Sequence, residues 1–215
     1  GVDRDGAMTP PIRPVQDPDA VRRAAELIQA GELVIIPTDT IYGIATTSDE
    51  EAAIRRLYEA RDRELEPASP FLMRDPGTMK ALARTNPHAE RLARRFWPGA
   101  LTLLLPPAGE LPQSLRRHPV ALRVPQFPSL MPLLDAVGGY LFASGAIRAG
   151  HPPAITAREA GLLFEERIAL ILDGGLALYG VPSTIVDCVQ DPPVIVRRGP
   201  ISEEKVWDAL NLDGR

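Results

Sequence analysis

Small polar residues at the end of an apolar run are the first candidates for chemistry in this sequence. Leu33 to Ile36 is followed by Pro37 and then by Thr38, Asp39 and Thr40. Two hydroxyls and a carboxylate could bind a small polar ligand, because ligands of α/β folds usually lie at the ends of strands. The same side chains could instead cap a turn by bonding to their own backbone. The residues alone leave both interpretations open.

Arginines carry nearly all of the positive charge, since Lys80 and Lys205 are the only lysines. The planar guanidinium suits phosphates and carboxylates, and charge-assisted bonds of roughly 1.5–3 kcal/mol each could together hold a nucleotide. The sequence has neither of the glycine-rich phosphate-binding patterns, so arginines would have to neutralise a triphosphate. For any single arginine, a solvated surface position is the simpler alternative. The candidates are Arg61, Arg63 and Arg198 for phosphates, and Arg123 for an acidic substrate group.

Other kinds of site find little support. His88, His118 and His151 lack the spacing of metal ligands, and no Gly-x-Ser-x-Gly elbow indicates a serine hydrolase. Cys188 is the single cysteine, which excludes an internal disulfide and a cysteine metal cluster. Asp173 before two glycines is more typical of a turn than of a functional carboxylate. We therefore expect no resident metal.

The elements that must position these residues alternate between strand and helix. Asp17-Pro18 predicts a helix start and Gly31 its end. Capping boxes at Ser48/Glu51 and Thr156/Glu159 predict two more helices, and residues 61–70 read as a charged surface loop. Further helices are expected at 87–96, 129–137 and after Ser202. Strands are expected at 33–36, 71–73, 101–105, 120–124, 140–143, 168–172, 184–186 and 194–196.

This alternation predicts an α/β fold, a sheet covered by helices. The 215 residues suffice for one large domain, here 8–215, with 1–7 as a tail or expression remnant. A net charge of −4 argues against a generally basic nucleic-acid binder. No apolar stretch is long enough for a membrane span and no secretory leader is visible, so we expect a cytoplasmic protein.

An ordered set of motifs gives a more specific prediction. Pro37-Thr38-Asp39-Thr40-Ile41-Tyr42-Gly43 resembles the opening signature of the YrdC-like family, whose best-known members are threonylcarbamoyl-AMP synthases. Matches to that family continue to about residue 203, nearly the whole chain. They are Trp97-Pro98-Gly99-Ala100-Leu101-Thr102, Ala121-Leu122-Arg123-Val124-Pro125, Gly150-His151-Pro152-Pro153-Ala154, Gly180-Val181-Pro182-Ser183-Thr184-Ile185-Val186-Asp187 and Arg197-Arg198-Gly199-Pro200-Ile201-Ser202.

The resemblance implies one domain, with a twisted mixed sheet and helices around a concave groove. It also implies a reaction in which L-threonine and bicarbonate are joined and then adenylylated by ATP with Mg²⁺, for the modification of tRNA. By this resemblance, the threonine and bicarbonate would be held by Thr38, Arg123 and Ser183. The nucleotide would be held by Arg61, Arg63, Ser144 and Arg198.

Some positions depart from the pattern that family synthases share. The usual Lys-x-Arg is Arg61-x-Arg63, as in the YciO-like branch, and Pro67-Ala68-Ser69 replaces Lys-Pro-Leu. The family segment Ser-Thr-Ser-Ala-Asn-x-Ser-Gly is here 143–150, with Ile147 for the asparagine and Ala143 and Ala149 for two serines. Synthase activity would then need compensation by Ser144 and Arg148.

These departures keep two alternatives open. The chain could be a YrdC-like paralogue that binds nucleotide, tRNA or double-stranded RNA without forming an adenylate. It could also have a carbamoyl-transfer role like that of the YrdC-like module in hydrogenase maturation proteins. Binding of a small molecule is favoured by the retention of Thr38, Arg123, Ser183 and Arg198, because a groove for RNA alone needs no such mixture of hydroxyls and cations.

Overall fold

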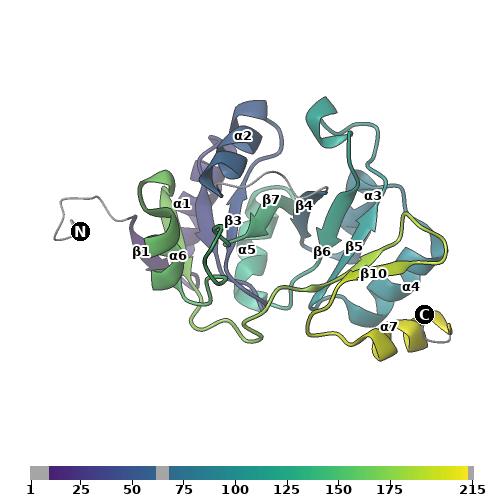
Figure 1. Ribbon diagram of the computed structural model, residues 1–215. Helices are drawn as coiled ribbons and strands as arrows, with labels where there is room; N and C mark the ends of the chain where they lie inside the picture. The colour runs from purple at the N-terminus through teal and green to yellow at the C-terminus, as the bar shows by residue number, and fades with distance from the viewer. Residues whose placement is uncertain (1–9, 62–67, 213–215) are drawn as a thin grey trace.

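One mixed sheet organises the molecule. The computed structural model describes residues 10–61 and 68–212. Ten strands join in the order β1-β8-β2-β3-β7-β4-β6-β5-β9-β10. Four of the neighbouring pairs are parallel, namely β1 with β8, β2 with β8, β4 with β6 and β5 with β9. The predicted α/β class and twisted mixed sheet are confirmed (Figure 1).

The strands are short and lie mostly where the sequence predicts them. They are β1 (Ile12–Pro14), β2 (Val34–Ile36), β3 (Gly43–Thr46), β4 (Ser69–Met73), β5 (Leu101–Leu105), β6 (Val120–Arg123), β7 (Tyr140–Gly145), β8 (Leu170–Asp173), β9 (Thr184–Asp187) and β10 (Val194–Arg197). The α-helices are α1 (Pro18–Gln29), α2 (Glu51–Ala60), α3 (Met79–Leu82), α4 (Pro87–Phe96), α5 (Met131–Ala136), α6 (Ala157–Phe164) and α7 (Glu203–Leu210).

Several helix ends form as their cap residues predict. Asp17 accepts a hydrogen bond from the Asp19 amide at the start of α1. Asn86, Thr156 and Ser202 cap α4, α6 and α7 in the same way. Helix α1 ends before Gly31, whose φ of +83° is a backbone conformation that glycine adopts without strain.

Two predictions about local structure are wrong, and one strand is missing from the predicted set. Ser48 does not cap α2, because the N-cap position is Glu50 and no side chain caps that helix. Strand β3 is the missing one, and the polar stretch after β2 is the connection of a hairpin, since β2 pairs antiparallel with β3. Arg61 and Ser69, expected in a surface loop, are both buried.

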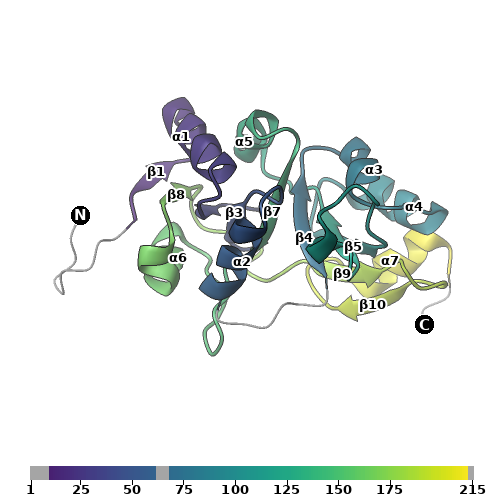
Figure 2. The ribbon, with the colours of Figure 1, turned by 90° about the horizontal axis from the view of Figure 1, so that it is seen from above.

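Alternation along β2 explains how the sheet separates two layers of core. Leu33 and Ile35 pack into the larger core cluster with α2, α4, α6 and α7, whereas Val34 and Ile36 pack into a smaller cluster with α1 and α5. Figure 2 shows α1 and α5 on one side of β3 and β7, with α2 and α6 on the other side. The helices α1 and α5 cover only the part of their face near β2, β3, β7 and β8.

Within the described residues, the apolar cluster under α1 and α5 does not extend over β6, β5 and β9. On β5, Leu101, Leu103 and Leu105 point into the larger cluster, so Thr102 must point to the opposite face. No helix within residues 10–61 and 68–212 is long and apolar enough to cross a membrane.

Candidate functional site

A pocket lies over the sheet face that the helices leave open. The strand registers place Leu72 beside Arg123 and Pro70 beside Ala121, while Thr102 lies beside Ile185. All of these residues line the pocket, which encloses about 680 Å³ of space not filled by atoms, open solvent included. Side chains on alternate strand positions therefore form its floor, in which Thr102 and Arg123 lie among apolar residues. A concave site with a few polar groups among apolar ones is typical of small-molecule binding.

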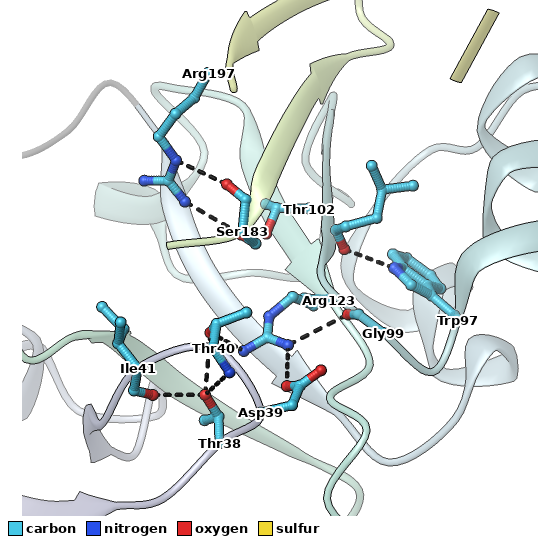
Figure 3. Close-up of polar contacts among 11 residues, drawn as sticks. Thr38, Asp39, Thr40, Ile41, Trp97, Gly99, Thr102, Arg123, Ser183 and Arg197 are labelled. Atoms are coloured by element: carbon cyan, nitrogen blue, oxygen red, sulfur yellow. Dashed lines mark hydrogen bonds and ion pairs between the residues drawn. The ribbon is translucent and has the colours of Figure 1, made fainter. Parts of the chain in front are cut away.

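The β2–β3 connection forms one wall and holds Arg123. The Arg123 Nη1 donates to Asp39 Oδ1 at 2.6 Å and to the Gly99 carbonyl at 3.3 Å, and Nη2 donates to Thr40 Oγ1 at 3.0 Å (Figure 3). Arg123 and Asp39 are only 6% and 2% exposed. Three acceptors around one buried guanidinium fix both its position and its orientation. Arg123 lines the pocket and Asp39 lies behind it.

Counting protons assigns the directions of the bonds between the two threonine hydroxyls. The Thr38 Oγ1 donates to the Ile41 carbonyl, which can only accept. Its contact with Thr40 Oγ1 at 3.1 Å must therefore use the Thr40 proton. Thr38 Oγ1 also accepts from the Thr40 amide, so its capacity is filled. Thr38 lines the pocket as predicted, but all the hydrogen bonds of its hydroxyl are made within the β2–β3 connection. Thr40 Oγ1 keeps one lone pair that can accept a hydrogen bond from a ligand.

The opposite wall combines two hydroxyls with an arginine. Ser183 Oγ and Thr102 Oγ1 lie 2.6 Å apart, although strand β5 and the residues before β9 are far apart in sequence. Arg197 donates from Nε to the Ser183 carbonyl at 2.9 Å and from Nη2 to Ser183 Oγ at 3.1 Å (Figure 3). One of the two hydroxyl protons forms the hydrogen bond between Ser183 and Thr102. The other proton is not used in that bond, so this wall can donate a hydrogen bond to a ligand.

A second arginine enters the pocket from the end of α2. Arg61 is 6% exposed, and its Nη1 donates to Ser144 Oγ on β7. Its Nε also approaches the Ile147 carbonyl at 3.5 Å. Arg61, Ser144 and Ile147 all line the pocket. Three arginines thus surround one cavity, and a buried guanidinium is an effective partner for phosphate or carboxylate oxygens.

The structure replaces one predicted arginine with its neighbour. Arg198 lies outside the pocket, with its side chain 85% exposed and its Nε paired with Glu203 at 3.2 Å. Burial alternates along β10, so Arg197 shares its face with Ile195, which packs against the core. Of the two adjacent arginines, Arg197 therefore lines the pocket and the predicted Arg198 does not. The alternation along this strand was the available signal.

Other sequence candidates have mixed outcomes. Arg148 donates to the Leu163 carbonyl and is absent from the pocket lining, so it does not replace the family asparagine. Arg63 lies outside the described residues. Asp39 and Thr40 were considered only as part of the polar stretch after Pro37, and Thr102 was assigned no role from the sequence. For Thr102 the signal was a single polar residue in an otherwise leucine strand.

Tyr42 fastens the first wall to the sheet from behind. Its hydroxyl donates to the Gly175 carbonyl at 2.7 Å and accepts from the Gly174 amide at 3.0 Å. Burial raises the pKa of Tyr42 to about 12, and the nearby Asp173 carboxylate adds to the rise. The phenol therefore stays protonated at neutral pH. Asp173 itself accepts from the Gly175 amide, as expected for a turn.

Comparison with known proteins finds relatives along most of the chain. The family model Sua5_yciO_yrdC, described as "Telomere recombination", matches residues 26–199. A Mycobacterium tuberculosis protein, named provisionally as a threonylcarbamoyl-AMP synthase, is 34% identical over 203 residues and 93% of each chain. The threonylcarbamoyl-AMP synthase of Bacillus subtilis is 34% identical over 190 residues, which are 86% of this chain and 55% of that protein.

A solved structure extends the likeness to three dimensions. The Pyrococcus abyssi Sua5 protein, crystallised in complex with L-threonine, superposes with a TM-score of 0.83 at 33% identity. The match covers 88% of this chain and 57% of the Sua5 chain. This chain therefore spans nearly all of one relative but little more than half of the two others.

Proposed function

Because the chain belongs to the Sua5/YciO/YrdC family, we propose that it is an ATP-dependent L-threonylcarbamoyl-AMP synthase. It would join L-threonine, bicarbonate and ATP and release pyrophosphate. The product would supply the threonylcarbamoyl group for the modification of tRNA in the cytoplasm. The observation that carries the proposal is the pocket in which Arg61, Arg123 and Arg197 surround a pair of hydroxyls.

The proposed chemistry needs positioning and positive charge more than a strong acid or base. Bicarbonate loses hydroxide to give carbon dioxide, and the neutral threonine amine forms a C–N bond to that carbon as its N–H proton leaves, so that the hydroxide and the proton become water. The resulting carboxylate forms an O–P bond at the α-phosphate, and the bond to the β-phosphate oxygen breaks. Negative charge then grows on the phosphates, where fixed cations stabilise it in a partly dry site.

The polar side chains of the pocket suggest how the substrates divide it. Arg123 and Ser183 would bind threonine, through its carboxylate and its hydroxyl, while Thr38 keeps the adjoining loop in shape. Arg61, Ser144 and Arg197 would bind the phosphates of ATP. Arg63 remains a proposed phosphate ligand from the sequence alone. This division is supported by the hydrogen-bonding capacity at each wall.

Magnesium would arrive with the nucleotide. Within the described residues, no group of three or more His, Cys, Asp or Glu side chains could hold a metal ion. Mg²⁺ commonly takes its ligands from substrate phosphates and water. We therefore propose that the ion enters on the phosphates of ATP and screens their charge.

Ile147 favours a second candidate function. Its side chain lines the pocket where family synthases have an asparagine, so one hydrogen-bonding group is lost there. A paralogue that binds nucleotide or RNA without adenylylation would tolerate that loss. RNA binding would weaken steeply with salt, because phosphate contacts release counterions.

Pyrophosphate release separates the two functions. Purified protein with ATP, Mg²⁺ and bicarbonate should release pyrophosphate only when L-threonine is added. Arg123→Ala should reduce this release by a factor of about 100 or more, since it removes charge-assisted bonds worth roughly 1.5–3 kcal/mol each. Circular dichroism of the variant checks its folding. ATP binding without threonine-dependent release would support the paralogue instead.

A further inference from the structure

Asp39 is a buried charge that the proposed reaction does not use directly. Its side chain is 1% exposed and does not line the pocket. Oδ1 accepts from Arg123 at 2.6 Å, and Oδ2 has no hydrogen-bond partner among the described residues. Burying a carboxylate oxygen without a partner costs free energy of folding. A residue kept at that cost calls for a functional explanation.

Asp39 acts on the pocket through Arg123. The carboxylate lies on the side of the guanidinium that faces away from the lining residues Ser183 and Thr102 (Figure 3). Thr40 and the Gly99 carbonyl hold the same guanidinium from two other directions. These three acceptors fix the orientation of the guanidinium, and with it the directions in which the remaining N–H groups of Arg123 point.

Asp39 also sets the charge that a ligand meets. An isolated buried guanidinium would attract any small anion, since its field is weakly screened in a partly dry pocket. A carboxylate 2.6 Å away cancels most of that field at distances larger than the pair itself. What remains is a directional donor with little net charge. Such a donor binds a carboxylate by geometry and does not repel an ammonium group beside it.

We propose that Asp39 is a positioning residue that fixes Arg123 and makes the pocket prefer a zwitterionic amino acid over a simple carboxylate anion. The identity of the amino acid as L-threonine rests on the proposed function. The role of Asp39 in charge selection does not rest on it. The proposal therefore predicts opposite effects of one substitution on two ligands.

The test compares L-threonine with acetate by calorimetric titration. Asp39→Asn keeps an oxygen that can accept from Arg123 and removes the charge. Acetate should then bind more tightly and L-threonine more weakly, so that the ratio of the two dissociation constants changes by about tenfold or more. Asp208→Asn, which removes the same charge from an exposed position of α7, should leave the ratio unchanged.

A second variant separates position from charge. Thr40→Val removes the acceptor for Arg123 Nη2 and leaves Asp39 in place. Both ligands should bind more weakly and their ratio should stay the same. This arm also tests the positioning role if Asp39→Asn fails to fold, because unchanged threonine affinity in Thr40→Val would overturn it.

Each outcome bears on the proposal. Parallel losses of both ligands in Asp39→Asn would show a merely structural role and overturn charge selection, as would two unchanged affinities. Tighter acetate binding in Asp39→Asn supports it. If the unaltered protein binds no L-threonine, the proposed substrate is wrong, but the acetate measurement still reports on Asp39.

Discussion

Arg197 and Arg198 are adjacent in sequence and have opposite environments. Arg197 donates twice to Ser183 and lines the pocket, whereas Arg198 is largely in solvent beside Glu203. Strand geometry causes the difference, because successive side chains on a strand point to opposite faces. A family motif that contains both residues cannot by itself tell which one reaches the ligand.

This pair gives a matched test at the scale of single residues. Arg197→Ala should weaken ATP binding by roughly 1.5–3 kcal/mol, the usual worth of hydrogen bonds to a charged group. Arg198→Ala removes the same charge and should change the affinity much less, since an exposed arginine is screened by water. Isothermal titration with ATP measures both. Equal losses in the two variants would refute the assignment of Arg197.

At the scale of elements, the approach of β10 to β9 positions one wall of the pocket. Gly199 lies two residues after the last residue of β10, and a Cβ atom there would lie 2.4 Å from the Thr184 amide nitrogen and 2.6 Å from the Ser183 carbonyl carbon. These are backbone atoms and cannot rotate away. Only glycine therefore allows the two segments to come close enough for Arg197 to hold Ser183.

Gly199→Ala should disturb stability and the site together. Overpacking of this kind costs typically about 1–3 kcal/mol, and the shift should also separate Ser183 from Arg197. Urea denaturation measures the stability and ATP titration measures the site. Gly109→Ala is the matched control, because no atom lies within 4 Å of its added Cβ. A Gly199→Ala protein with unaltered stability would contradict this account.

The helices and strands also show which elements can be predicted from nearby residues in the sequence. Cap residues and apolar runs predicted α1, α4, α7 and β5 because those signals act within a few residues. Strand β3 was missed because Gly43 to Thr46 has only one large apolar residue, Ile44, and its pairing with β2 and β7 stabilises it. Tertiary contacts of this kind decide the state of short segments.

At the scale of the whole molecule, the pocket arises where the helix layers do not overlap. Helices α1 and α5 cover one face near β2 and β8, while α3, α4 and α7 lie with β5, β9 and β10 at the other end (Figure 2). The family resemblance predicted a groove and five of the residues that line the pocket, namely Thr38, Arg61, Arg123, Ser144 and Ser183. The contacts of Asp39 with Arg123, and of Thr102 with Ser183, depend on strand order, which periodicity does not specify.

Cys188 lies in the larger core, which continues beneath the pocket, and it should make the stability of the protein depend on pH in the alkaline range. Burial raises the pKa of Cys188 from 9.0 to about 12. Between these values the unfolded chain has lost a proton that the folded protein retains, so stability falls as the pH rises above 9. By pH 10 the loss of stability from this group should be on the order of 1 kcal/mol.

Cys188→Ala should remove that loss of stability. It should keep the loss at higher pH that comes from Tyr42, whose pKa is also raised to about 12. Urea denaturation at pH 8, 9 and 10 measures the slope, and equal slopes in both proteins would show that the thiol ionises freely in the folded state.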